Sequence, residues 1–421
     1  MNTPIIYHGT WWFPTEGLIS PHRKDCKNVT GTLTYYGNKP TKLELYFTPQ
    51  DYEKTIPTPH HPMVIWGETA DGRLVSIFGA HCTAVSNWTC SVYEVDYIVD
   101  GIHLLSKDTK IVSKAIIKYP NLVNWCYKPR VESNTLKNKD VVLTLNMHSN
   151  DYIFDATIDN DVRIYGLSDI KYNWKKNGGF QYNITEDTKC GIAFKEPKGL
   201  EECLEYIAKF SDFLSFAIFA QQHPTSICLT LNNDSKVYLM FRIKESSSLY
   251  GESLLKHKAF SDKIPAILAK WFSVYTELSP IVRQLLRDRN YDLFDTSHFA
   301  SLAQVLDGYF KRFINKLDGK DIRQYRDEIN ILLERLKNVN AITSCKIDAD
   351  VLTESRHKYT HYTPSGDNPK AVKGYELLQL THKCRVLLAC CILDCLGLSN
   401  EEINVCCKDS EIEYIINEIG N

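Results

Sequence analysis

The sequence predicts an α+β protein of several domains, and three observations support this class. Up to about residue 195, short apolar runs alternate with turn residues, which is typical of strands. From about residue 291 onward, apolar residues recur at three- and four-residue steps, which indicates helices. The chain has 421 residues, too many for one ordinary core, so two or three domains are expected.

The N-terminal part, residues 1–195, is expected to form an antiparallel β-sandwich or barrel. Lys42–Phe47 alternates between apolar and polar residues, and the turn Asp71-Gly72 separates two further apolar runs. Turn signals recur at short intervals throughout, as they do in all-β domains. Residues 196–290 mix helical signals with a β-like piece. We expect this mixed middle region to pack on the β domain.

Residues 291–421 are expected to form an all-α bundle of four to five helices. The expected helices cover about 296–317, 321–339, 348–362, 371–396 and 411–418. Pro364 should end the third of them, and Gly397 should cap the fourth, which is apolar on most sides and therefore central. Ser399 and Glu402 have the spacing of a capping box for a short helix between the last two.

Overall composition does not indicate a nucleic-acid partner. Lys and Arg number 49 against 51 Asp and Glu, which gives a net charge of −2, and no long basic run occurs. Any positive potential for RNA must therefore be local or created by assembly. The start of the chain has no signal-peptide pattern, and no apolar run is long enough to span a bilayer. We expect a cytoplasmic protein with no membrane partner, whose 14 cysteines are mostly thiols.

Four cysteines lie close together near the C-terminus: Cys384, Cys390, Cys391 and Cys395. Structural zinc sites usually combine two closely spaced ligand pairs, and no matching second pair is present. The neighbours of these cysteines are leucines and other apolar residues, so buried thiols in a helical core are expected. No cofactor or metal is predicted.

The pattern most suggestive of chemistry is Arg356 followed by His361, near the end of the third expected helix. Arginine holds phosphate with a planar fork of donors, and histidine exchanges protons near neutral pH. Five helical residues advance by roughly 140° beyond one turn, so the two side chains do not stack on one face unless the helix frays. His357 and His361 are four residues apart and do stack.

A structural interpretation of the same residues is also open. Arg356 could pair at the surface with Glu354 or Asp350. His361 could place its charge at the carboxyl end of the helix, where a cation is favourable.

The pattern in this helix resembles a known one. Arg356, a polar residue, three variable residues and His361, followed by an aromatic residue, resemble the ribonuclease motif of HEPN domains. The segment Phe299–Phe310 resembles the first HEPN helix, with Asp307 as its acidic residue. This resemblance covers about residues 291–421.

The N-terminal part adds a second resemblance. Gly9–Pro14, Gly31–Tyr35 and Leu43–Leu45 resemble the β-rich N-terminal domain of ApeA-type bacterial anti-phage proteins. Those proteins pair this domain with a C-terminal HEPN ribonuclease, and both ends of the chain match in that order. The resemblance implies an effector of abortive infection.

Cleavage of RNA without a metal is the activity that this resemblance implies. His361 would take the proton of a ribose 2′-hydroxyl or protonate the leaving 5′-oxygen, and Arg356 would hold the phosphate. The products would carry a 2′,3′-cyclic phosphate and a 5′-hydroxyl. HEPN enzymes generally form homodimers, which would bring two motifs into one cleft. Transfer RNA is a plausible substrate by family analogy, and the β domain would sense a phage-derived trigger.

Supporting roles are expected for a few neighbours of the motif. His357 and Tyr359 could position the reacting groups, although core packing is the simpler explanation for Tyr359. Lys358 would add positive charge to the cleft. Asp307 could orient an arginine or a histidine, or serve packing alone.

Two other functions compete with a nuclease. The first is a HEPN bundle that binds nucleotides, RNA or a partner without cutting. The second is a β-sandwich receptor for carbohydrate or protein with a helical dimerisation domain. The presence of both Arg356 and His361 argues against the first, and no sequence feature demands the second.

Overall fold

A computed structural model gives the fold, and it describes most of the chain. The described residues are 3–14, 28–46, 63–86, 90–126, 131–135, 141–145, 152–176, 180–287, 296–314, 324–362, 364 and 368–420. The chain divides into two compact units. The first unit comprises residues 1–122, 128–208 and 223–246, and the second comprises 123–127, 209–222 and 247–421.

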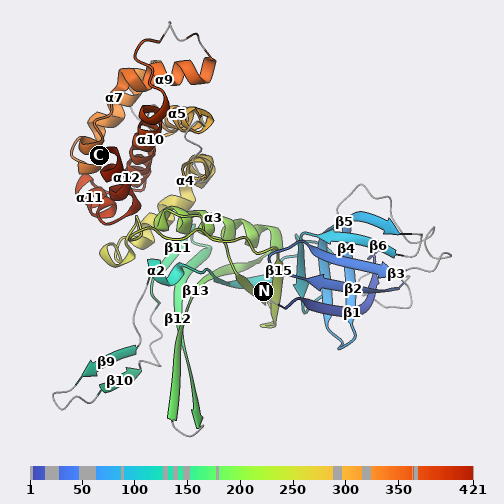
Figure 1. Ribbon diagram of the computed structural model, residues 1–421. Helices are drawn as coiled ribbons and strands as arrows, with labels where there is room; N and C mark the ends of the chain where they lie inside the picture. The colour runs from blue at the N-terminus through green and yellow to red at the C-terminus, as the bar shows by residue number, and fades with distance from the viewer. Residues whose placement is uncertain are drawn as a thin grey trace. The chain divides into compact units, whose positions relative to one another are not determined.

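A closed β-barrel stands at the N-terminal end of the first unit (Figure 1). Its strands are β1 (Ile5–Trp12), β2 (Val29–Tyr35), β3 (Thr41–Tyr46), β4 (Met63–Thr69), β5 (Leu74–Ser86) and β6 (Cys90–Val95). They pair antiparallel in the order β5-β4-β1-β2-β3-β6, and β6 pairs with β5 to close the ring. Alternate side chains point inward, among them Trp11, Leu33, Leu43, Ile77 and Tyr93. The predicted alternation thus reflects, over the described residues 42–46, a barrel wall with one buried face.

From β5 the sheet continues beyond the barrel. β5 also pairs with β7, and the order then runs β15-β14-β8-β13-β12-β11, again antiparallel. The bounds are β7 (Tyr97–Asp100), β8 (Val112–Lys118), β11 (Asp155–Ile158), β12 (Val162–Lys176), β13 (Phe180–Lys198), β14 (Ser226–Leu231) and β15 (Lys236–Phe241). A separate hairpin joins β9 (Val131–Thr135) to β10 (Val141–Leu145). The expected antiparallel β-rich domain is therefore confirmed as a barrel that opens into an extended sheet.

Helices dominate the second unit. They are α4 (Ile264–Leu285), α5 (Thr296–Tyr309), the π-helix η2 (Phe310–Ile314), α7 (Tyr325–Arg335), α8 (Asn340–Cys345), α9 (Ala349–His361), α10 (Gly374–Cys395), α11 (Asn400–Cys407) and α12 (Glu411–Gly420). The described residues also include three short or shared elements, α2 (Leu122–Trp125), α3 (Leu200–Ile218) and the 3-10 turn η1 (His257–Ala259). The all-α C-terminal region is confirmed.

Residues 196–290 do not form a body of their own. The hairpin β14–β15 belongs to the first unit, whereas α4 belongs to the second. The helix α3 starts in the first unit and ends in the second. The expected domain boundaries at residues 195 and 290 stay predictions.

One expected helix is shorter than predicted, and a further helix follows it. The helix predicted over residues 321–339 ends four residues early, because α7 ends at Arg335, and the short α8, which begins at Asn340, was not predicted. Between them Val339 is extended and fully buried. The side chain of Asn404 takes up the backbone groups at the break, because it accepts from Asn340 N at 2.7 Å and donates to Asn338 O at 3.1 Å. Burial of Val339 and the hydrogen bonds of Asn404 therefore separate α7 from α8.

The helix α10 is the centre of the bundle, as its composition predicts. Most of its residues from Cys384 to Leu393 are buried. Gly397 follows it with φ +90°, the left-handed conformation that a glycine cap supplies. The capping box of α11 is also present, with Glu402 N donating to Ser399 Oγ and Ser399 N donating to Glu402 Oε2. Within the described part of the chain, no helix combines the length and the apolar character needed to cross a bilayer.

A glycine packed closely against a buried ring in the barrel yields a stability prediction. A Cβ on Gly67 would lie 2.2 Å from two ring carbons of the buried Trp11. Gly67→Ala should therefore lower the free energy of unfolding of the barrel by about 1–3 kcal/mol through overpacking. Urea unfolding followed by tryptophan fluorescence measures this, with Gly308→Ala as control because a Cβ there meets nothing within 4 Å. An unchanged transition for Gly67→Ala would show that the barrel accommodates the methyl group.

Candidate functional site

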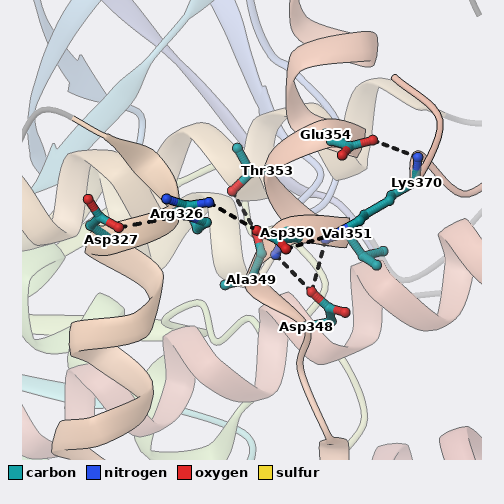
Figure 2. A network of polar contacts seen from close by, with 9 residues as sticks. All are labelled: Arg326, Asp327, Asp348, Ala349, Asp350, Val351, Thr353, Glu354 and Lys370. Carbon is teal, nitrogen blue, oxygen red and sulfur yellow. Dashed lines mark hydrogen bonds and ion pairs between the residues drawn. The ribbon is translucent and has the colours of Figure 1, made fainter. Parts of the chain in front are cut away.

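The helix α9 carries the Arg356/His361 pattern, and its ends lie where the sequence predicts. Asp348 caps the N-terminus, and its side chain accepts from Asp350 N at 2.8 Å and Val351 N at 3.2 Å (Figure 2). At the other end, Tyr362 turns left-handed with φ +52° and is largely exposed. The chain stays helical through His361, so it does not fray between the arginine and the histidine.

Acidic residues near the start of α9 have cation partners other than Arg356. Asp350 lies 2.8 Å from Lys370 Nζ and 3.6 Å from Arg326 Nη1, and Glu354 Oε2 accepts from Lys370 N at 2.6 Å (Figure 2). The surface pairing of Arg356 with Glu354 or Asp350 is therefore wrong. These contacts instead tie α9 to α7 and to the segment that precedes α10.

Arg356 points toward α5 and α7. Its Nη2 donates to Asp307 Oδ2 at 2.9 Å, and its guanidinium carbon lies 4.4 Å from the centroid of the Tyr325 ring. The Arg356 side chain is 22% exposed and that of Asp307 is 16% exposed, so the pair is largely withdrawn from water. Lys311 Nζ lies 2.6 Å from Asp307 Oδ1, one helical turn further on. The Asp307 carboxylate thus forms ion pairs with two cationic side chains, those of Arg356 and Lys311.

A second carboxyl group lies beside this pair. Glu328 of α7 is 1% exposed, and its carboxyl group is within hydrogen-bonding reach of Asp307. Burial, followed by the charge and the hydrogen bond of Asp307, raises the pKa of Glu328 to about 7. Tyr325 is buried between these groups and donates its hydroxyl to Ala303 O at 3.1 Å.

The two histidines lie on another face of α9. The rings of His357 and His361 are 4.9 Å apart between centroids, and both side chains are exposed. No hydrogen bond or ring contact joins either one to Arg356 in the described structure. The structure therefore brings the histidines together and brings Arg356 to Asp307. It leaves the two members of the predicted motif on different faces, as their spacing on an intact helix requires.

Tyr359 and Lys358 occupy supporting positions. The Tyr359 hydroxyl donates to Val372 O at 2.8 Å, and its ring meets Phe299 edge-on at 5.9 Å between centroids. Lys358 Nζ lies 5.4 Å from the centroid of the Tyr359 ring. Desolvation and the nearby charge of Lys373 lower the pKa of Lys358. Tyr359 thus packs α9 against α5 and against the segment before α10.

Three of the four clustered cysteines are core residues, and the fourth, Cys395, is only partly buried. Cys384, Cys390 and Cys391 are buried along α10, and burial raises the pKa of Cys384 and Cys391. Cys390 Sγ lies 3.9 Å from Cys407 Sγ of α11. The described residues contain no group of three His, Cys, Asp or Glu side chains placed to hold a metal ion.

Sequence reasoning missed three members of the cluster around Arg356. Lys311 follows Asp307 at the four-residue spacing of helical ion pairs, which is a usable signal. Glu328 is a charged residue on the apolar stripe between Tyr325 and Ile329, and such a position points to a buried partner. The ring of Tyr325 under the guanidinium carries no sequence signal beyond its apolar face.

The fold and the site together define a class of protein. A barrel-and-sheet unit is followed by a helical unit in which a motif helix carries an anchored arginine and exposed histidines. Residues 300–402 match the family model for the Apea-like HEPN domain. Residues 6–271 match the family model for ApeA N-terminal domain 1.

The chain therefore belongs to the ApeA family, as an ApeA-like protein with a C-terminal HEPN domain, the architecture of a HEPN-type anti-phage effector. Searches of curated proteins and of solved structures found no match.

Removing the shared carboxylate should destabilise the helical unit. Asp307→Ala leaves Arg356 and Lys311 without their acceptor, and Arg356 is mostly buried. We expect the free energy of unfolding to fall by about 1–3 kcal/mol, as for a charged hydrogen bond lost in a buried setting. Denaturant unfolding followed by circular dichroism measures it. Asp350→Ala, whose ion pairs are more exposed, should cost distinctly less; equal losses would contradict a special role for the Asp307 cluster.

Proposed function

We propose that this protein is a metal-independent endoribonuclease whose chemistry is carried by Arg356 and His361 of α9. One observation carries the proposal: α9 presents an arginine held by Asp307 and Tyr325, and an accessible histidine at its C-terminal end. A fixed cation and an accessible imidazole are the groups that phosphodiester cleavage by the 2′-hydroxyl requires. The match to an HEPN family supports this reaction class.

The proposed reaction divides the work between the two residues. A neutral imidazole, that of His361, takes the proton of the ribose 2′-hydroxyl as its oxygen attacks phosphorus. The bond from phosphorus to the 5′-oxygen breaks, and an imidazolium returns a proton to that oxygen. Arg356 donates to the non-bridging oxygens and stabilises the charge that develops on them. Asp307 and Tyr325 fix the position of the guanidinium before phosphate arrives, and phosphate would then compete with Asp307 for its donors.

A homodimer completes the proposed site. Within one chain Arg356 and His361 lie on different faces of α9 and do not touch. Two copies of α9 in one cleft would supply an acid and a base from separate histidines and a second arginine for the phosphate. They would also gather His357, Lys358 and their partner copies, which supplies the local positive potential that a net charge of −2 does not.

The biological setting follows from the family. As a HEPN-type anti-phage effector, the protein would act on RNA in the cytoplasm during abortive infection, with transfer RNA as the first substrate class to test. The barrel-and-sheet unit would sense or transmit a phage-derived trigger that releases the nuclease.

Substituting the motif residues tests the assignment. Arg356→Ala and His361→Ala should each lower RNA cleavage, and toxicity during infection, by at least about 100-fold, because each removes a group that acts in the transition state. Cleavage of total RNA and of purified transfer RNA measures it. Arg326→Ala is the matched control, since Arg326 is an arginine of the same unit that pairs with Asp350. Full activity in either motif variant would contradict the site.

The alternative function is a module that binds RNA without cutting it. It would be favoured if the unmodified protein binds RNA but releases no cleavage products under any trigger.

Mixing inactive variants tests the shared cleft. If each dimer combines groups from both chains, co-expressed Arg356→Ala and His361→Ala chains should recover part of the cleavage that neither variant shows alone. A heterodimer keeps one arginine and one histidine in the same cleft, and that histidine must both take the 2′-hydroxyl proton and return it to the 5′-oxygen, so recovery should be partial. Tandem affinity tags on the two variants isolate the heterodimer for assay. Fully inactive heterodimers would show that each chain needs its own complete motif.

A further inference from the structure

The buried carboxyl group of Glu328 can form a hydrogen bond with its neighbour only if it is protonated. No donor of the described residues reaches its Oε2, which is buried. Its neighbour is another carboxyl group, that of Asp307, within hydrogen-bonding reach. Two carboxyl groups form a hydrogen bond only if one of them carries a proton. Asp307 already accepts from Arg356 and pairs with Lys311, so the proton belongs on Glu328.

The charges that face Glu328 come from each element packed around it. α5 contributes Asp307, η2 contributes Lys311 and α9 contributes Arg356. On α7 itself Tyr325 is adjacent, and beyond it lies Cys384 of α10; burial raises the pKa of both, so both stay neutral near pH 7. With Glu328 protonated, two cations face one carboxylate and the cluster has one positive charge in excess. With Glu328 ionised, two carboxylates balance the two cations.

We propose that Glu328 is a positioning residue that acts through Arg356: it keeps a proton against Asp307 and so leaves the guanidinium with charge available for a phosphate group. This inference rests on the proposed nuclease function, in which Arg356 is the phosphate ligand. Glu328 touches neither substrate nor reacting atoms. Its buried place behind Asp307 instead sets how strongly the carboxylates hold Arg356.

The direction of the pH effect follows from burial. Because the pKa of Glu328 is raised to about 7 in the folded protein, the folded state favours the protonated form. Its contribution to stability is fully present below the pKa of an unfolded glutamate and is lost as pH rises through about 7. Over the same interval near pH 7 the cluster loses its excess positive charge, and binding of phosphate groups should weaken.

Infrared spectroscopy of the full chain tests the proton directly and needs no catalysis. Protein labelled with ¹³C at glutamate carboxyl groups should show a protonated-acid carbonyl band at pH 6 that is lost at pH 8. Glu328→Gln should lack this band. Glu334→Gln, on an exposed residue of the same helix, should keep it. A Glu328 that is already ionised at pH 6 would overturn the inference.

RNA binding tests the consequence for Arg356. The probe is a fluorescent 2′-O-methyl oligoribonucleotide, which has no free 2′-hydroxyl at internal positions. The protein carries His357→Gln and His361→Gln, so that neither imidazole contributes to the binding profile. In this background, affinity by anisotropy should fall by about threefold between pH 6 and pH 8, the size of one partly screened charge. Adding Glu328→Gln should flatten the profile, whereas adding Glu334→Gln should not. An unchanged profile with Glu328→Gln would overturn the inference.

The two tests separate this inference from the proposed function. If Glu328 loses its proton between pH 6 and pH 8 but RNA affinity does not change over this range, Glu328 does not act through Arg356. This conclusion holds even if the unmodified protein cuts RNA. If Glu328 carries no proton at pH 6 and the protein still cuts RNA normally, the inference about Glu328 is wrong and the proposed nuclease function is unaffected. If Glu328→Gln does not fold, Asp307→Asn replaces it. Removing the Asp307 charge should then shift loss of the acid band to lower pH, and an unshifted band would contradict the pairing.

Discussion

The ion pair between Arg356 and Asp307 is the contact on which the candidate site depends. It fixes α9 against α5 at 2.9 Å, and the Tyr325 ring supports the guanidinium from the α7 side. An α-helix turns by roughly 100° per residue. When Arg356 faces inward, the side chains of His357 and His361 therefore point roughly 100° and 140° away from it around the helix axis, toward the outside. The same pair therefore holds the arginine that we propose as phosphate ligand and leaves the proposed proton-transfer groups exposed. It also holds Arg356 to a carboxylate, so in the proposed reaction phosphate would compete with Asp307 for the guanidinium.

Much of the fold follows from local patterns, and the departures have packing causes. Alternation in residues 42–47 and the turn at Asp71-Gly72 indicated antiparallel strands, because each strand has one buried face. Closure into a barrel was open, since it depends on the pairing of β5 with β6, which no local pattern records. The early end of α7 and the short α8 were missed because burial of Val339 and the hydrogen bonds of Asn404 are tertiary effects.

The site was only partly visible in the sequence. The motif placed Arg356 and His361 near the end of one helix, and the end at Tyr362 is where Pro364 indicated it. The partner of Arg356 could not be derived from spacing within α9, because Asp307 lies 49 residues away in sequence. Glu328 joins the cluster only through the packing of α7 against α9, whereas Lys311 follows Asp307 by four residues and pairs with it. A charged residue on an apolar stripe, such as Glu328, is the signal most worth following in related chains.

The chemistry of the RNA ends tests the central claim most directly. RNA cut by the purified protein is mapped with ligases and phosphatases that distinguish the possible termini. Attack by the 2′-hydroxyl, with Arg356 and His361 as the acting groups, predicts a 2′,3′-cyclic phosphate on one fragment and a 5′-hydroxyl on the next. Fragments with 5′-phosphate and 3′-hydroxyl ends would contradict it, because they arise when water attacks phosphorus, the reaction typical of metal-activated nucleases.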